Sequence, residues 1–514
     1  MSITSLNYFI FLILTVLVFY IVPVRFRWCA LLTFSFSFFL LASAQVAGYF
    51  LVGTLSVYIG ARQIAEKAST DRSKKAILIM TIVFNVLLLF VLKYINIIPN
   101  TINTFGTLFH VNTHLGTINL VAPIGVSYYS LSMISYLVDV YWLTIPAEKN
   151  IAKLMLFSCY YPCLVSGPII RYSDMKKEFF ENGRLDWNNI FSGFYRIVYG
   201  LLKKMVIADN LAVLVNAVFD GTDRYKGIFI VFGVIAYALQ IYCDFSGCMD
   251  IVIGTSKLYG IKLPENFRSP FLSRNLSEFW RRWHITLGQW GKDYIMYPLL
   301  KSDRFQRIGK KAKKRFGKKI GKKIPVIMSI FVLWVIIGIW HGASYKYIFA
   351  AGILPWLYFS ISELAGDCFK KWNTRLHIHT DSFSFHIIQS LRTLFLMCVI
   401  WLFALAPSLS ASGNLIADLF HNDFSLIKPF ISDNIIMDHS IGAVAVKWGL
   451  ILISFIGVAV VDYLKYNDVD VLERFSYQSW WFRYLILFFM IIVTLMFGVY
   501  GPGYIAADFI YGGF

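Results

Sequence analysis

Long apolar runs separated by short polar segments recur along nearly the whole chain. A helix needs about 20 apolar residues to cross a bilayer, and the pattern predicts twelve such spans. They lie at roughly 7–22, 27–43, 46–60, 76–95, 117–142, 188–202, 226–243, 324–340, 345–362, 386–407, 446–464 and 481–499. A further apolar run, 152–170, is interrupted by Pro162, Gly167 and Pro168. We interpret it as re-entrant, because non-helical backbone is tolerated at membrane depth where protein covers it. We expect one all-α membrane bundle over residues 1–514.

Basic residues gather between the apolar runs, and their distribution predicts the orientation of the bundle. The largest group, Lys301–Lys323, holds twelve Lys or Arg residues and one acid, Asp303. Because cytoplasmic loops are enriched in Lys and Arg, we place this group in a cytoplasmic segment, 244–323, and both termini outside. The loop 96–116, which has no charged residue, is then external. Lys203 and Lys204 fit less well, because this orientation puts them at the outer end of a span.

Composition agrees with a membrane protein and disfavours several other classes. Only 15% of the 514 residues are charged and 58% are hydrophobic, whereas soluble domains carry about 25% charge. The net charge of +19 would fit a nucleic-acid binder if the basic residues formed a water-facing surface. Their position between apolar runs is typical of loops that face anionic lipid, so we expect membrane lipid and no nucleic acid as a partner.

Familiar soluble signatures are absent from the sequence. The seven cysteines indicate no disulfide framework, and no His or Cys cluster has the spacing of a zinc site. We therefore expect no metal. The chain contains no G-x-S-x-G nucleophile elbow, P-loop or H-E-x-x-H motif, which disfavours a hydrolase or a nucleotide-driven pump.

One histidine ends an apolar run that rises from the basic segment. The run Phe331–Trp340 leads into His341, which is followed by Gly342, Ala343 and Ser344. The helix from the basic segment to this point covers about 25 Å, so His341 is expected within or across the membrane. An ionisable side chain at that depth predicts a functional site, with room beside the ring because the next residues are small. The alternative is an ordinary interfacial histidine at a helix end.

A second histidine, His284, lies in an aromatic segment. Apolar residues recur around it at three- and four-residue steps, namely Trp280, Trp283, Leu287 and Trp290. This spacing predicts one amphipathic helix in or just under the lipid headgroups. Ser277 is expected to cap this helix, and Glu278 to pair with Arg282 four residues on. An interfacial helix with a purely structural role remains the alternative to a site.

Two other features have stronger structural than chemical interpretations. Asp244 follows the span 226–243 and Asp250 lies six residues on. Both are expected to be solvated at a helix end rather than to take part in catalysis. The basic group Lys301–Lys323 has a field that can attract an acyl donor bearing phosphates, but anchoring against anionic lipid is the stronger interpretation.

Several of these residues belong to motifs that resemble a known family. The motifs are Ala122–Tyr129 (APIGVSYY), Ser135–Tyr141 (SYLVDVY), Leu164–Arg171 (LVSGPIIR), Asp244–Gly247 (DFSG) with Asp250, Pro264–Phe267 (PENF), Phe279–His284 (FWRRWH) and Gly338–Gly342 (GIWHG). Through them, about residues 120–345 resemble the membrane-bound O-acyltransferases. The similar branch is the bacterial one that supplies acyl groups to extracytoplasmic polysaccharides in alginate or peptidoglycan O-acetylation and teichoic-acid D-alanylation. One departure is Gly291, where relatives usually carry an aromatic residue.

The resemblance implies a fold, a reaction and a set of site residues. Helices, including re-entrant and interfacial ones, would surround a central funnel that the donor enters from the cytoplasm and the acceptor from outside. His341 would be the catalytic base and His284 the second catalytic histidine. Donor and substrate contacts are expected from Arg281, Arg282, Trp283, Asp244, Asn266 and Trp340.

The same resemblance implies the donor, the partner and the location. We expect acetyl-CoA as donor, no bound cofactor, and an extracytoplasmic partner protein of the SGNH or alginate-acetylation type, in the cytoplasmic membrane of a bacterium. Two alternatives remain open. One is D-alanyl transfer to teichoic acid from a carrier protein, and the other is a polysaccharide or lipid transporter without chemistry of its own.

Overall fold

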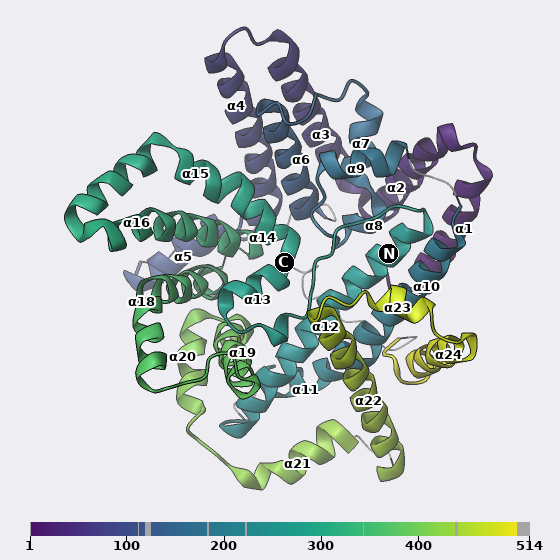
Figure 1. Cartoon of the computed structure of the whole chain (residues 1–514), viewed down its shortest axis with the longest axis vertical. Helices are drawn as coiled ribbons and strands as arrows, with labels where there is room; N and C mark the ends of the chain where they lie inside the picture. Colours follow the sequence, from purple (N-terminus) through teal and green to yellow (C-terminus); the bar gives the residue numbers. More distant parts are fainter. Residues whose placement is uncertain are drawn as a thin grey trace. The chain divides into compact units, whose positions relative to one another are not determined.

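The computed structural model describes residues 2–111, 113–118, 125–181, 185–220, 224–342, 344–436 and 440–500, and nearly all of its regular structure is helical (Figure 1). Within these ranges the strand-like pairing is one isolated bridge between Phe267 and Trp283. Eight helices in the described part are long and apolar enough to cross a membrane. The predicted all-α, multi-pass membrane fold is therefore confirmed.

Each of the eight long apolar helices overlaps one predicted span, although several extend well beyond it. They are Val24–Ala42, Asp71–Tyr94, Ile228–Leu258, Asp303–His341, Tyr345–Arg375, Phe383–Leu405, Gly442–Tyr466 and Trp480–Phe497. The other four predicted spans correspond to shorter helices, α1 (Leu6–Ile21), α3 (Ala47–Arg62), α6 (Val126–Tyr141) and α10 (Trp187–Leu201). The predicted start of 117–142 is wrong, since 117 and 118 are not helical. Ala122, Pro123 and Ile124 of the first motif lie outside the described residues. The total of twelve crossings stays a prediction.

Two compact units make up the chain. Unit 1 comprises Met1–Ile197 with Ile251–Pro264, and unit 2 comprises Val198–Asp250 with Glu265–Phe514. Besides α1, α3 and α6, the helices of unit 1 are α2 (Arg27–Ser43), α4 (Asp71–Leu89), α5 (Ile97–Leu108), α7 (Ile151–Cys159), α8 (Tyr161–Leu164) and α9 (Tyr172–Phe180). Two helices, α10 and α12 (Ile228–Leu258), contribute residues to both units.

The expected break in the run 152–170 is present in unit 1. Helix α7 ends at Cys159, Tyr160 leaves the helical conformation, and the single turn α8 is followed by a turn and then by residues without regular structure. Gly125 contacts this segment, and a Cβ atom there would lie 1.8 Å from the carbonyl oxygen of Leu164. With its φ of 71°, this position requires glycine. The placement of the segment as re-entrant remains a prediction.

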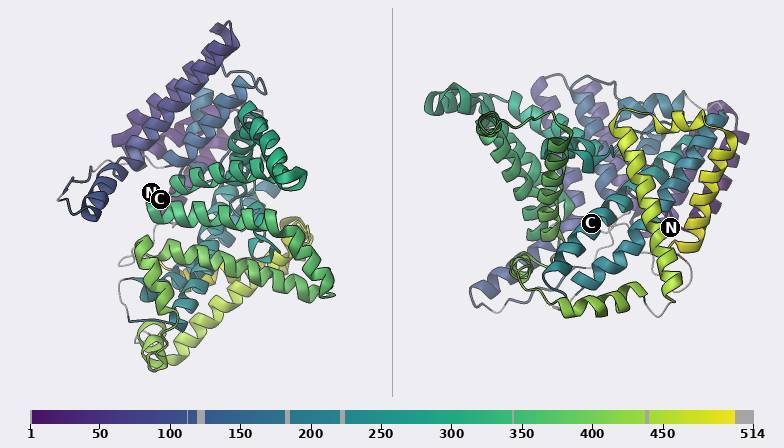
Figure 2. Two further views of the ribbon diagram at one scale, coloured as in Figure 1. Left: turned by 90° about the vertical axis from the view of Figure 1, so that its left-hand side faces the viewer. Right: turned by 60° about the horizontal axis from the view of Figure 1, so that its bottom comes forward.

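Unit 2 contains the remaining helices and both candidate histidines. They are α11 (Asp209–Phe219), α13 (Leu276–Arg282), α14 (Ile285–Gly291), α15 (Tyr297–Lys301), α16 (Asp303–His341), α17 (Tyr345–Ile348), α18 (Leu354–Arg375), α19 (Phe383–Leu405), α20 (Leu409–Asp418), α21 (Ile427–Ile431), α22 (Ile441–Tyr466), α23 (Val471–Ser476) and α24 (Trp480–Phe497). A π-helical segment, η5 (Leu202–Ala208), joins α10 to α11. The long helices α22 and α24 can be followed in yellow-green and yellow in the right-hand view of Figure 2.

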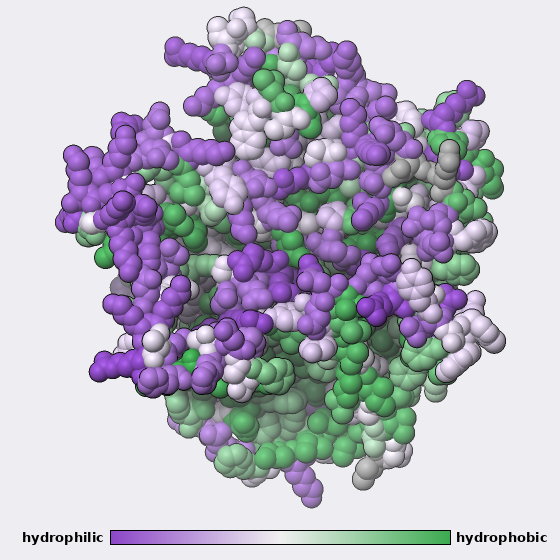
Figure 3. Space-filling view, in the orientation of Figure 1, coloured by the Kyte–Doolittle hydropathy of each residue, from purple (hydrophilic) through white to green (hydrophobic). Residues whose placement is uncertain are grey.

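Helix α16 contains most of the basic segment and doubles back on itself. At Gly317 the backbone takes a φ of 76° and interrupts the helix. A Cβ atom on Gly321 would lie 2.5 Å from the Cα atom of Lys313, and one on Gly309 would lie 3.2 Å from Pro325. The two arms therefore pack closely as a hairpin around Gly317. In Figure 3 the surface over this hairpin, at the left of the view, is densely hydrophilic.

Candidate functional site

The segment around His284 is not the single helix that its spacing predicted. Helix α13 ends at Arg282, and α14 begins at Ile285. Between them His284 adopts a left-handed conformation, with φ of 47° and ψ of 51°. Such a conformation costs a residue with a Cβ atom about 1–3 kcal/mol, so tertiary contacts must hold it. The predicted cap is also wrong, because Asn275 rather than Ser277 accepts the bond from the Glu278 amide.

Asn266 holds the backbone of this turn. It is fully buried, and its carbonyl oxygen accepts a hydrogen bond of 3.0 Å from the Ile285 amide. Its side-chain Oδ1 accepts 3.0 Å bonds from the amide and hydroxyl of Thr286, and lies 3.3 Å from His284 Nδ1. Its Nδ2 faces Met249 Sδ on α12 at 3.3 Å. The expected donor-binding residue thus has its polar atoms directed at the protein's own groups.

His284 itself is surrounded by aromatic rings. Its side chain is 3% exposed, and Phe245 on α12 packs edge-on against it at 4.9 Å between centroids. Burial lowers the pKa of the His284 imidazole well below its usual range, and the neighbouring His341 adds to that shift. The cause is that desolvation disfavours the charged form, so burial favours the neutral imidazole.

His341 ends α16 beside the same aromatic group. It is 8% exposed, and the Trp340 ring lies 5.1 Å from its ring and 6.1 Å from that of His284. The structure therefore brings His341, His284 and Trp340 together, while their roles in a reaction stay predictions. The expected open space is not found on the Gly342 side, where a Cβ atom would lie 2.6 Å from the Tyr347 ring. Ala343 lies outside the described residues.

The neighbouring aromatic and basic residues differ in what they contact. Trp283 is 1% exposed and packs within 5.0 Å of the Phe267 ring, centroid to centroid. Arg282 forms the predicted pair with Glu278 at 3.0 Å and stacks 4.5 Å from the Tyr466 ring on α22. Both side chains therefore hold α13 in place. Arg281 is exposed, which leaves it as the arginine of this pair that faces outward.

Asp244 lies inside a helix rather than at its end. Helix α12 continues to Leu258, and Asp244 and Asp250 are 1% and 4% exposed. The expectation of solvated carboxylates at a helix end is therefore wrong, whereas the cytoplasmic placement of 244–323 stays a prediction. The physical reason is that both carboxylates have buried cationic partners on η5, as described next.

Lys203 and Lys204 are those partners. They are 3% and 2% exposed, and the helical structure continues through η5 into α11 rather than ending at these lysines. Lys204 Nζ lies 2.6 Å from Asp244 and 2.8 Å from Asp209, while Lys203 pairs with Asp250. Buried charges are stable only when paired and hydrogen-bonded. Sequence reasoning missed this cluster, although charges of opposite sign within two apolar runs are a signal that could have found it.

A close helix approach makes these ion pairs possible. A Cβ atom at Gly247 on α12 would lie 2.8 Å from the carbonyl oxygen of Gly200 and 3.2 Å from the Lys204 amide nitrogen. The backbones of α10 and α12 therefore nearly touch there. Helix α22 joins the same region, because the Tyr242 hydroxyl donates a 2.5 Å hydrogen bond to Asp462. Helix α12, which carries Phe245 and Met249 against the His284 turn, is thus fixed by polar contacts on several sides.

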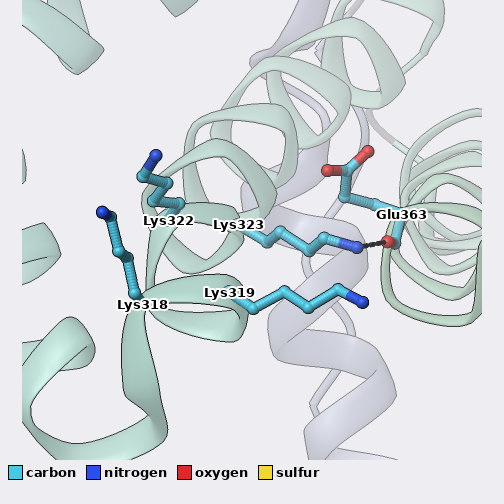
Figure 4. A pocket seen from close by; sticks show the side chains of 5 residues that line it. All are labelled: Lys318, Lys319, Lys322, Lys323 and Glu363. Carbon is cyan, nitrogen blue, oxygen red and sulfur yellow. Dashed lines mark hydrogen bonds between the residues drawn. The ribbon is translucent and has the colours of Figure 1, made fainter. Parts of the chain in front are cut away.

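The basic hairpin of α16 forms a separate pocket with α18. The pocket has a volume of about 490 Å³ and is lined by Lys318, Lys319, Lys322, Lys323 and Glu363 (Figure 4). Lys323 donates a 2.5 Å hydrogen bond to the Glu363 carbonyl. Lys319 pairs with Asp367 at 2.9 Å. The concentration of lysines can attract phosphate groups of a donor or of lipid.

Comparisons with known proteins support the family resemblance that the motifs indicated. The family model described as MBOAT, membrane-bound O-acyltransferase family, matches residues 36–313. This range includes Asp244, Asn266 and His284, and ends before His341.

Three relatives illustrate the range of similar proteins. A probable alginate O-acetylase AlgI of Pseudomonas syringae pv. tomato is 29% identical over 420 residues, 81% of this chain and 74% of that protein. The peptidoglycan O-acetyltransferase of Helicobacter pylori is 30% identical over 326 residues, 58% of each chain. The teichoic acid D-alanyltransferase of Bacillus subtilis is 27% identical over 276 residues, 52% of this chain and 64% of that one.

Proposed function

The chain belongs to the membrane-bound O-acyltransferase family, and we propose that it passes an acetyl group from cytoplasmic acetyl-CoA toward an extracytoplasmic polysaccharide. The observation that carries this proposal is the meeting of His341 and His284, both buried, around the Trp340 ring. The names of the alginate and peptidoglycan O-acetylating relatives support acetyl as the group and a polysaccharide as the final acceptor. The location would be the cytoplasmic membrane of a bacterium.

His341 would act as general base in this reaction. Its imidazole takes the proton from the acceptor hydroxyl as the oxygen attacks the thioester carbonyl. The resulting tetrahedral intermediate collapses with loss of the coenzyme A thiolate, which then takes up the proton. A positioned base contributes about 10²–10⁴-fold to the rate of such a step. His284, neutral because it is buried, adds no positive charge that would oppose proton uptake by His341.

Other residues would serve the donor and the acceptor. The exposed Arg281 and the lysine pocket of α16 offer cations to the phosphates of acetyl-CoA as it approaches. An SGNH-type partner outside the membrane would complete transfer to the polysaccharide. No cofactor is required by this scheme. A D-alanyl group delivered by a carrier protein is the second candidate, favoured by the similarity to teichoic acid D-alanyltransferase.

Replacement of the proposed base tests the function. His341→Ala is expected to reduce acetyl incorporation into cell-surface polysaccharide by about 10²–10⁴-fold, with a normal amount of detergent-stable protein. His341→Gln, which keeps more of the side-chain volume, should be equally inactive. Wild-type acetylation by well-expressed His341→Ala protein would contradict the assigned role and favour a transporter. Incorporation of D-alanine instead of acetate would select the second candidate.

A further inference from the structure

Hydrogen bonds in the turn that carries His284 limit which nitrogen of the imidazole can carry the proton. Asn266 Oδ1 is 3.0 Å from two Thr286 donors, an amide N–H and a hydroxyl. An atom that faces a backbone N–H must be an acceptor, so the oxygen of the Asn266 amide occupies this position. The same oxygen lies 3.3 Å from His284 Nδ1. That nitrogen can complete the arrangement only by carrying the proton.

We propose that Asn266 is a positioning residue that holds His284 in its Nδ1–H tautomer, with the Nε2 lone pair directed toward the reaction centre. The neutral ring then accepts at Nε2, where it can receive a hydrogen bond from the acceptor hydroxyl or from a protonated His341. The role of Nε2 in the reaction rests on the proposed function. The tautomer itself is a property of the protein without substrate. Asn266 thereby has a role other than the donor contact expected from the sequence.

The surroundings of Asn266 fix the orientation of its side-chain amide. The residue is fully buried, and its Nδ2 is occupied by Met249 Sδ at 3.3 Å. Its backbone oxygen is also fixed by the Ile285 amide. A flipped amide would set its NH₂ group against the Thr286 N–H, which is repulsive. The left-handed conformation of His284 is the local strain that this set of bonds offsets.

The groups that face the His284 ring limit what else could set its charge. From α16 the titratable neighbour is His341, which disfavours a second positive charge. From α12 the contact is the apolar ring of Phe245, and Trp340 supplies another aromatic ring. A carboxylate in place of the Asn266 amide would therefore be the dominant new charge at the ring. This carboxylate would raise the pKa of the imidazole, because an opposite charge favours the protonated form.

Nitrogen-15 NMR of histidine-labelled, full-length protein tests the assignment directly. The His284 signal is identified by its loss in His284→Gln. In the wild type we expect a protonated Nδ1 and an unprotonated Nε2 at neutral pH. In Asn266→Leu we expect the proton to shift to Nε2 or to be shared between the nitrogens. A wild-type ring protonated on Nε2, or an unchanged tautomer in Asn266→Leu, overturns the proposal.

Two further variants keep the test decisive if Asn266→Leu does not fold. Asn266→Asp preserves the acceptor, so we expect it to keep the Nδ1–H tautomer and to raise the pH midpoint of His284 titration by about one unit or more. Asn275→Ala is the matched control, because Asn275 caps the adjacent helix α13 without contacting the ring. An equal midpoint shift in Asn275→Ala, or none in Asn266→Asp, contradicts the assignment.

Kinetics connect the tautomer to the reaction. Asn266→Leu should lower kcat about 10–100-fold, as loss of a histidine's outer hydrogen-bond partner does elsewhere, with little change in KM for acetyl-CoA. A rise in KM for acetyl-CoA with kcat unchanged would favour the donor-binding role of Asn266 and refute the positioning role. If His341→Ala stays active, the proposed function fails, whereas the NMR result still decides the role of Asn266.

Discussion

The packing of Tyr347 against Gly342 gives a quantitative prediction for the Gly342→Ala variant. The added Cβ atom would lie 2.6 Å from Tyr347 Cδ2 and 3.1 Å from Cε2. Ordinary contacts of this kind begin near 3.4 Å, so ring and backbone must separate by about 1 Å. The φ of Gly342 is 163°, which is extended backbone, so the cost of the substitution comes from this contact rather than from backbone strain.

The ring has little freedom to retreat, because α17 is held on two sides. A Cβ atom at Gly338 would lie 3.1 Å from both Ile348 Cα and the Tyr347 carbonyl oxygen, which means that α17 already packs directly on α16. Lys346 Nζ donates to the carbonyl oxygens of Ala404 and Ala406, at 3.3 and 3.0 Å, at the end of α19. We therefore expect much of the displacement to occur at the end of α16, where His341 is located.

Displacement of a catalytic group by about 1 Å can lower a rate about 10²-fold, which corresponds to about 2.7 kcal/mol in the activation barrier. Overpacking of this kind costs a further 1–3 kcal/mol of stability, roughly. Gly342→Ala should therefore reduce acetyl incorporation about 10²-fold and lower the thermal midpoint of the detergent-purified protein. Combination with Tyr347→Leu, which removes the ring, should restore part of the activity.

The control variant is Gly366→Ala on α18. No atom lies within 4 Å of a Cβ placed there, and Ala in a helix is favoured over Gly by about 0.5–1 kcal/mol. It should leave the rate unchanged and stability equal or higher. Wild-type acetylation by Gly342→Ala protein would refute the reasoning, because it would mean that neither Tyr347 nor His341 is held as the structure places them.

Two further predictions concern orientation and the arginine pair. Cysteine placed at position 310, in the basic hairpin, should resist an impermeant thiol reagent in intact cells. Cysteine at position 113, which follows helix α5 in the segment 96–116, should react. Labelling at 310 from outside would reverse the assigned topology and the donor path. Arg282→Ala should lower the thermal midpoint through loss of its contacts with Glu278 and Tyr466. Arg281→Ala should raise KM for acetyl-CoA and leave stability unchanged. The reverse pattern would show that Arg282, not Arg281, contacts the donor.

The positions of the spans were predictable because hydrophobic length is a local property. A run such as 446–464 needs only enough consecutive apolar residues to cover the bilayer, and the structure places α22 there. The ends of the spans were less predictable. Cys243 looked like the end of a span because Asp244 follows it, yet the helix continues to Leu258. The lysine that neutralises Asp244 lies forty positions earlier in the chain, where local hydropathy cannot register it.

The turn at His284 escaped prediction for a related reason. Trp280, Trp283 and Leu287 have helical spacing, so periodicity alone favours one continuous helix. The break depends on Asn266, whose two oxygens make four contacts with residues 284–286. These contacts replace the hydrogen bonds that a continuous helix would make. The departure at Gly291 has a similar explanation, since a Cβ atom there would lie 2.4 Å from Leu333 on α16.

These cases share one physical cause, which also bears on the chemistry. In an apolar bundle a polar side chain is stable only if another part of the chain satisfies it, so each buried polar residue implies a distant partner. The buried Asp244 carboxylate requires a cation such as Lys204. The left-handed turn at His284 requires a hydrogen-bond acceptor such as Asn266. The same requirement applies to His341, whose buried imidazole would exchange a proton in the proposed reaction. A neutral His284 with the proposed Nδ1–H tautomer would accept a hydrogen bond from the protonated His341 ring at Nε2 without adding a second buried charge.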